Sequence, residues 1–144
     1  MRCPTCRSVA DFILKRPPQD DRAARRMYEG AGLGSKDVNI FNPYDSYAPM
    51  AQLFLEGFQC HGVRVGDAFA FYAGDIRFGG THPFCSSRGG LGTGHCRTAV
   101  YTDSIEQLRG TAGARKVKVR ARSALAASTT PSSGGWIMFG KSPS

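Results

Sequence analysis

The chain has 144 residues, a hydrophobic fraction of 41% and a formal net charge of +8. This length suits one domain with its own core. No apolar run approaches the ~20 residues that cross a bilayer, so we expect no membrane span. Met1 to Val9 holds cysteines and arginines where a secretory signal has an apolar stretch. Because the five cysteines are odd in number, reduced thiols or metal ligands are favoured over disulfides. We therefore expect an intracellular, reducing compartment, with mitochondria and plastids as candidates.

Positive charge gathers at the two ends of the chain. Residues 1–36 carry eight Lys/Arg and four Asp/Glu, residues 37–110 carry five and seven, and residues 111–144 carry six and none. A near-neutral centre with basic ends is typical of a protein that lies along a polyanion. The alternative is a solvated surface with a high isoelectric point.

Residues 1–36 are predicted to form a basic N-terminal extension. Cys3-Pro-Thr-Cys6 is followed by a predicted short helix over 8–15, which ends before Pro17-Pro18. A second helix is predicted from Asp20-Asp21 to about Tyr28, since acidic residues in the first turn and basic residues near the end complement the helix dipole. Glycines at 30, 32 and 34 then end it.

Residues 37–122 are predicted to form the globular core. Val38, Ile40 and Phe41 indicate a short strand. A helix is predicted after Ser46 or Tyr47, because Met50, Leu53 and Phe54 have the spacing of one helical face.

The most apolar segment of the chain, residues 63–78, alternates large and small or charged residues. A period of two predicts short antiparallel strands, and Gly66-Asp67 and Gly74-Asp75 suit the turns between them. The run Arg-Val-Gly-Asp-Ala-Phe-Ala-Phe resembles the turn–strand elements of small SH3-like barrels in RNA-associated proteins. After a glycine-rich loop over 79–94, a strand is predicted at 97–102, and a helix from Asp103 or Ser104 to about Leu108.

A basic segment closes the predicted core. In Arg-Lys-Val-Lys-Val-Arg-Ala-Arg, residues 115–122, the apolar and basic positions alternate, which predicts a strand with one charged face. That face could follow the phosphates of a nucleic acid. The alternative is an edge strand that its lysines protect from aggregation. The predicted nucleic-acid-binding residues are Arg115, Lys116, Lys118, Arg120 and Arg122.

Residues 123–144 form a tail rich in Ala, Ser, Thr, Pro and Gly, a composition typical of disorder. The tail nevertheless ends in four large apolar residues. We interpret them as an anchor that docks on this domain or on another protein subunit. The anchor consists of Trp136, Ile137, Met138 and Phe139.

Two cysteine and histidine pairs have the spacing of zinc ligands. Cys3-x-x-Cys6 is one pair and His82-x-x-Cys85 is the other. Together they would complete one structural zinc site and hold the N-terminus against the glycine-rich loop. The alternative is that the cysteines are free thiols and His82 is a surface residue.

No catalytic set emerges from the sequence. Cysteines and histidines crowd residues 60–96, but nothing places a thiol beside an activating base or helix terminus. The glycine-rich run 89–94 leads into a predicted strand, whereas a phosphate-binding loop opens a helix. Asp67 and Asp75 follow glycines at predicted turns, where aspartate is common for turn reasons alone.

The sequence therefore predicts an α+β fold: a small antiparallel sheet or partly open barrel over about 59–122, with short flanking helices and extended termini. The function predicted is that of a non-enzymatic structural or accessory subunit of a ribonucleoprotein, such as an organellar ribosome, with RNA and other protein subunits as partners. A protein-shell subunit, such as a virion component, and a small zinc- or thiol-dependent enzyme are the alternatives. No small-molecule substrate is identified.

Overall fold

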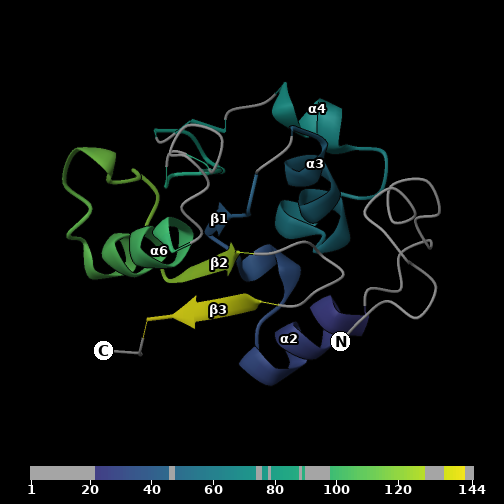
Figure 1. The fold of residues 1–144 in the computed structure, drawn as a ribbon, viewed down its shortest axis with the longest axis horizontal. Helices are drawn as coiled ribbons and strands as arrows, with labels where there is room; N and C mark the ends of the chain where they lie inside the picture. Colours follow the sequence, from purple (N-terminus) through teal and green to yellow (C-terminus); the bar gives the residue numbers. More distant parts are fainter. Residues whose placement is uncertain are drawn as a thin grey trace.

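A three-stranded mixed sheet forms the centre of the fold (Figure 1). In this computed structural model, residues 22–45, 48–73, 76–77, 79–87, 89, 98–128 and 135–141 are described. Strand β2 (Ser123–Ala127) lies between β1 (Ile40–Asn42), to which it is parallel, and β3 (Trp136–Gly140), to which it is antiparallel. The sheet is small and open. The predicted α+β class is confirmed.

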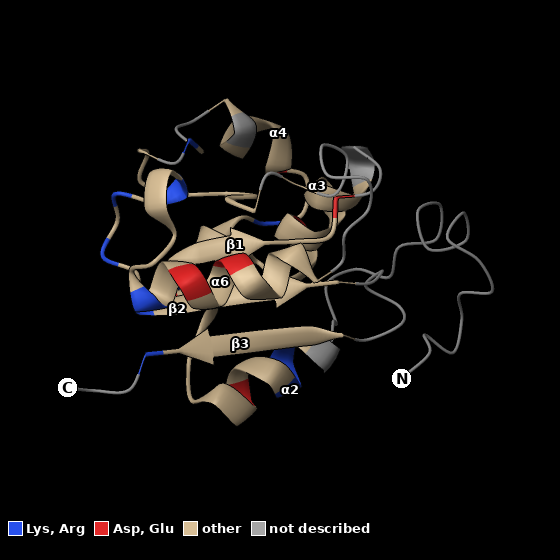
Figure 2. Ribbon diagram, turned by 60° about the vertical axis from the view of Figure 1, so that its left-hand side comes forward, with Lys and Arg blue, Asp and Glu red and all other residues tan. Residues whose placement is uncertain are grey.

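Helices cover both faces of this sheet. Helix α6 (Ala99–Arg109) lies across one face, as Figure 2 shows, and contacts all three strands. Helices α2 (Arg22–Ala31) and α3 (Ala48–Gly57) contribute to the core on the other face. The helices that the sequence predicts over about 20–28 and after residue 47 correspond to α2 and α3.

The side chains of the strands alternate between two hydrophobic clusters. Phe41 and Leu125 join the α3 side, where Phe41 packs edge-to-face against Phe58 with ring centroids 6.2 Å apart. Ile40 and Ala124 face the opposite way, with Leu108 of α6 packed against them. All five residues of β2 are buried, because its two faces are both covered. The small side chains of this strand allow the helices to approach closely.

Short elements complete the described part of the chain. A single bridge pairs Phe41 in parallel with Phe84, beside β1. No helix among the described residues is both long enough and apolar enough to span a bilayer. The remaining elements are η1 (Ser35–Asp37), η2 (Cys60–Gly62), α4 (Ala68–Tyr72) and η3 (Gly113–Arg115).

The strands predicted within residues 63–78 are absent from the described part of that segment. Gly66 turns the chain at φ +92°, and α4 follows at once. Ala68 is the buried residue of this helix and Phe69 is 74% exposed, which is the reverse of the predicted pattern. The sheet therefore comes from other segments than those the sequence indicated.

Three further expectations are corrected. The strand predicted over 97–102 is replaced in its described part by α6, which begins at Ala99. Residues 116–122 are irregular, although the alternation of their side chains between solvent and core is as expected. The tail expected to be disordered contributes β2 and β3, which join α2 in the same core as residues 37–122. The helix predicted over 8–15 lies outside the described residues.

Candidate functional site

A buried asparagine marks the carboxyl end of the first strand. Asn42 is fully buried on the α6 face of the sheet. Its amide nitrogen donates to Asp103 Oδ2 at 3.0 Å and to Ser104 Oγ at 3.1 Å. These bonds fix the end of β1 to the first half of α6.

Two consecutive serines join the same network. Ser86 Oγ lies 2.5 Å from Asp103 Oδ2 and 3.1 Å from Asn42 Oδ1. The backbone N–H of Ser87 also donates to Asn42 Oδ1, at 3.4 Å. We call Asn42, Ser86, Ser87, Asp103 and Ser104 the carboxyl-edge cluster. The cluster fixes the chain at the point where it leaves the Phe84 bridge.

Asp103 is the acceptor at the centre of this cluster. Its side chain is 2% exposed, and the guanidinium of Arg115 forms an ion pair with Oδ1. Arg115 also pairs with Glu106, and its carbonyl accepts from the Gln107 amide at 2.8 Å. A buried carboxylate needs ion pairs and hydrogen bonds of this kind to offset its loss of hydration. Asp103 therefore anchors η3 and residue 86 to α6.

A second group of residues lies beside the cluster. The N–H of Cys85 donates to the carbonyl of Phe41 at 2.9 Å. Burial raises the pKa of the Cys85 thiol well above its ordinary value, and the nearby Asp45 raises it further. Gly89 has a left-handed φ of +70°, which favours glycine, and a Cβ there would lie only 2.2 Å from Asp45 Oδ2. The start of the glycine-rich run thus approaches Asp45 closely, next to a thiol that stays protonated at neutral pH.

The carboxyl end of β2 is tied to α6 as well. The Tyr101 hydroxyl oxygen lies 2.6 Å from the carbonyl oxygen of Gly135 and 2.5 Å from Ser128 Oγ. These contacts hold the residue after β2 and the residue before β3 beside the N-terminal half of α6. Ligands of open sheets bind outside the carboxyl ends of parallel strands, where such connections meet. This edge is therefore the candidate functional site.

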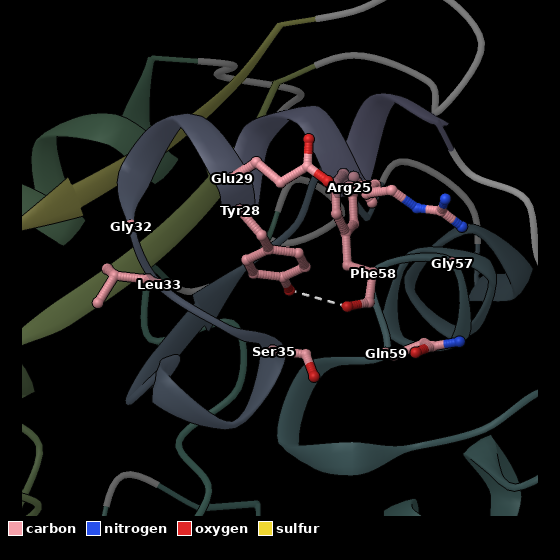
Figure 3. Close-up of a pocket in the computed structure, with 10 residues that line it drawn as sticks. Arg25, Tyr28, Glu29, Gly32, Leu33, Ser35, Gly57, Phe58 and Gln59 are labelled. Carbon is pink, nitrogen blue, oxygen red and sulfur yellow. Dashed lines mark hydrogen bonds between the residues drawn. The ribbon is translucent and has the colours of Figure 1, made fainter.

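A cavity of about 450 Å³ lies elsewhere, between α2 and the residues that follow α3 (Figure 3). Tyr28 stands at its wall and donates to the carbonyl of Phe58 at 2.8 Å. The buried thiol of Cys60 lies next to Tyr28, with its Sγ 3.6 Å from the hydroxyl oxygen. Burial raises the pKa of this thiol to about 12. Arg25 and Glu29 supply charge at the rim. Tyr28 is fixed by these bonds, and it closes one side of the cavity.

The predicted zinc ligands are only partly described. His82 packs against His61, with ring centroids 4.8 Å apart, and Cys85 lies beside Asp45. Among the residues that the structure describes, no group of three or more His, Cys, Asp or Glu could hold a metal ion. Cys3 and Cys6 lie outside the described residues, so the zinc site stays a prediction.

The predicted nucleic-acid-binding residues lie in two different environments. Arg115 is engaged by Asp103 and Glu106. The other four are exposed but do not lie on a strand. These four are Lys116, Lys118, Arg120 and Arg122.

The predicted apolar anchor lies within the domain. Its four residues belong to β3, paired with β2 in register from Ala127↔Trp136 to Ser123↔Gly140. The ring of Trp136 packs edge-to-face on Phe58 at 5.3 Å, and Phe139 meets Tyr101 at 6.3 Å. Docking on this domain, one of the two alternatives, is therefore what the structure contains. Ile137 is 46% exposed, and any binding of another subunit by this strand stays a prediction.

Comparison with known proteins identifies the family. The family model described as thiolase C-terminal domain-like matches residues 11–139, which is most of the chain. The chain belongs to this thiolase C-terminal domain-like family. No curated protein matches the sequence significantly.

A solved structure shares the fold of this thiolase C-terminal domain-like chain. It is described as an Ltp2-ChsH2(DUF35) aldolase, with a TM-score of 0.72 and 21% sequence identity. The alignment covers 83% of this chain and 31% of that chain. The present chain therefore spans about a third of the length of the protein that it resembles in fold.

These findings correct the predicted function. A ribonucleoprotein subunit is wrong, because the family is named for an enzyme and the shared fold occurs in an aldolase. The predicted RNA binding is wrong for the same reason. RNA binding therefore does not explain the excess of basic residues near the ends of the chain.

Sequence reasoning missed the carboxyl-edge cluster. Asn42 lies in a turn-like Asn-Pro-Tyr-Asp run, and the serines lie in a loop-like stretch. Turn and loop formation alone therefore accounts for these polar residues in the sequence. One signal was available. Asp103, Ser104 and Gln107 recur at the spacing of one helical face, which would have predicted a polar buried stripe.

Proposed function

We propose that this chain is the thiolase-type subunit of an enzyme complex and that its partner is a DUF35-type protein. The observation that carries the proposal is the family match over residues 11–139. The fold likeness to an aldolase described by two components, Ltp2 and ChsH2(DUF35), supports the choice of partner. A protein partner of this kind replaces the RNA that the charge distribution suggested.

The chemistry proposed for the complex is that of an aldolase, which makes or breaks a carbon–carbon bond. The carboxyl edge of the sheet is where this chain would contribute. The buried members of the carboxyl-edge cluster are bonded to one another, so we assign them a positioning role. Asn42 and Asp103 would hold Ser86 and Ser87 in one place relative to α6.

Purification of the affinity-tagged full chain from its native cells tests the proposal. The expected result is a stoichiometric DUF35-type protein, identified by mass spectrometry, in a fraction with carbon–carbon bond-cleaving activity. Nuclease treatment should leave that fraction unchanged. An isolated chain, or one that purifies with ribosomal proteins and RNA, would contradict the proposal. Because the chain is basic, the wash should be at raised salt, which removes non-specific polyanion binding.

A further inference from the structure

A second cavity lies at the opposite edge of the sheet from the carboxyl-edge cluster. Strand β1 is parallel both to β2 and to the bridge residue Phe84. The residues that precede these three parallel pieces of chain therefore lie at one edge of the sheet. Those residues, together with His61 of η2, line a cavity of about 440 Å³, which we call the amino-edge pocket. Its lining consists of Lys36, Val38, Asn39, His61, Thr81, His82, Val119 and Arg120.

The described lining of this pocket carries only positive charge. Lys36 and Arg120 line it, and no aspartate or glutamate is among its described lining residues. Neither cation forms an ion pair with any residue that the structure describes. The carboxylate nearest in sequence, Asp37, instead accepts from the N–H of Gly34 at 2.7 Å. Two basic side chains therefore line one cavity without a described counter-charge.

His61 lines the same pocket and carries an unsatisfied polar atom. Its Nε2 is buried and has no hydrogen-bond partner among the described residues. Buried polar atoms are nearly always paired, so an unpaired one calls for an explanation such as a ligand. The ring is held by stacking on Phe71 at 5.6 Å and by contact with His82 at 4.8 Å. The backbone of His61 is left-handed, at φ +56°, a strained conformation for a side-chain-bearing residue that clusters at binding sites.

His82 and Thr81 add hydrogen-bonding capacity. Thr81 Oγ1 lies 3.0 Å from His82 Nδ1, which leaves Nε2 of that ring for another partner. Burial is the larger cause that lowers the pKa of His61 to about 4, and the neighbouring His82 is the smaller one. The imidazole of His61 is therefore neutral at pH 7. A neutral imidazole can still donate one hydrogen bond. The pocket thus combines two cations with neutral donors.

We propose that the amino-edge pocket binds the phosphate group of a small molecule. Two unit charges match a phosphate dianion, and the guanidinium of Arg120 can bind two of its oxygens at once. The neutral donors of His61 and Thr81 would take the remaining oxygens. The volume falls in the range of about 300–1,000 Å³ that holds small-molecule ligands, so an organic group attached to the phosphate also has room. The site is independent of the proposed function, because it lies at the other edge of the sheet.

Calorimetric titration of the full chain with inorganic phosphate tests this site. Arg120→Ala and Lys36→Ser should each weaken phosphate binding about tenfold or more, since each removes a charge-assisted hydrogen bond. Lys116→Ser is the matched control, because Lys116 is equally basic and exposed but does not line the pocket. The control should bind phosphate as the unmodified chain does.

Each of four outcomes would overturn the proposal. If neither pocket variant weakens binding, or if the control weakens it equally, the affinity comes from overall charge and not from a site. If acetate binds as tightly as phosphate, the site does not select a dianion. A second readout uses the histidine ring signals in NMR spectra: those of His61 and His82 should shift on titration with phosphate, and unchanged signals would contradict the pocket even if a variant were unstable.

Discussion

Asp103 is the residue on which the candidate site most depends. Replacing it by asparagine removes the charge that pairs with Arg115 and turns one acceptor oxygen into a donor facing other donors. Breaking a buried ion pair from one side destabilises a protein by about 3–5 kcal/mol. Because Arg115 is partly exposed, we expect Asp103→Asn to lower the free energy of unfolding by about 3 kcal/mol, measured by urea denaturation.

Glu106→Gln is the control for this variant. Glu106 pairs with the same arginine, but its side chain is 35% exposed. Exposed pairs contribute about 0–1 kcal/mol, so the control should change stability by less than about 1 kcal/mol. Equal effects of the two substitutions would show that Asp103 is not the centre of the network.

His61 gives the fold a dependence on acid. Its pKa is lowered by burial and by His82 to about 4 in the folded state, from 6.5. Between these values the unfolded chain binds a proton that the folded chain does not. The stability that neutral His61 contributes is therefore fully present above pH 6.5, and it is lost as the pH decreases towards 4.

The substitution His61→Asn tests this dependence, because asparagine tolerates the left-handed backbone at this position. Urea unfolding at pH 6.5 and at pH 4 should show a smaller loss of stability for the variant than for the unmodified chain. An identical loss would mean that other groups account for the acid sensitivity.

At the scale of elements, α6 explains one failure of sequence reasoning. Its buried face carries Val100, Asp103, Ser104 and Gln107, at the spacing of a helical stripe. Only one of these residues is apolar, so a search for hydrophobic periodicity could not detect the face. The β-branched and aromatic residues at its start favoured a strand locally, and the hydrogen bonds of the polar stripe outweighed that preference.

Helices α2 and α3, by contrast, were predictable. In α3 the local signal agrees with burial, since Met50 and Phe54 form a buried stripe. Residues 63–78 gave the opposite result, because the alternation of Phe69 and Phe71 with alanines fits a short helix equally well. Alanine has the highest helix propensity, and Ala68 packs inward while Phe69 remains in solvent. A short apolar run does not distinguish the two-residue period of a strand from the 3.6-residue period of a helix.

Strand β2 was hidden by its composition. Ser-Ala-Leu-Ala-Ala has low strand propensity, yet every residue is buried between helices. Leu125 is its one large side chain and is completely buried. We expect Leu125→Ala to lower the free energy of unfolding by about 2–5 kcal/mol, because it leaves a cavity in the central strand.

Ile137→Ala, in the neighbouring strand β3, is the matched control. Ile137 is 46% exposed, so its truncation should change stability by about 0.5 kcal/mol. Thermal and urea unfolding report both values. A loss at Leu125 no larger than the loss at Ile137 would contradict the placement of β2 at the centre of the sheet.

At the scale of the molecule, the excess of basic residues was real but misinterpreted. Composition shows that positive charge gathers near the ends of the chain; it does not show what the charge meets. The fold divides these residues, since Arg115 pairs with acidic groups whereas Arg120 and Lys36 line one pocket. That pocket depends on contacts between segments far apart in sequence, which no local pattern reports.

A DUF35-type protein is the proposed partner of this thiolase C-terminal domain-like chain. Sedimentation velocity of the two purified proteins, alone and mixed, tests it most directly, with an unrelated protein of similar size and charge as the control. We predict a faster-sedimenting species of defined stoichiometry that persists at raised salt and forms only with the DUF35-type protein. If the mixture sediments as the sum of its components, or if the control associates equally, the claim is contradicted.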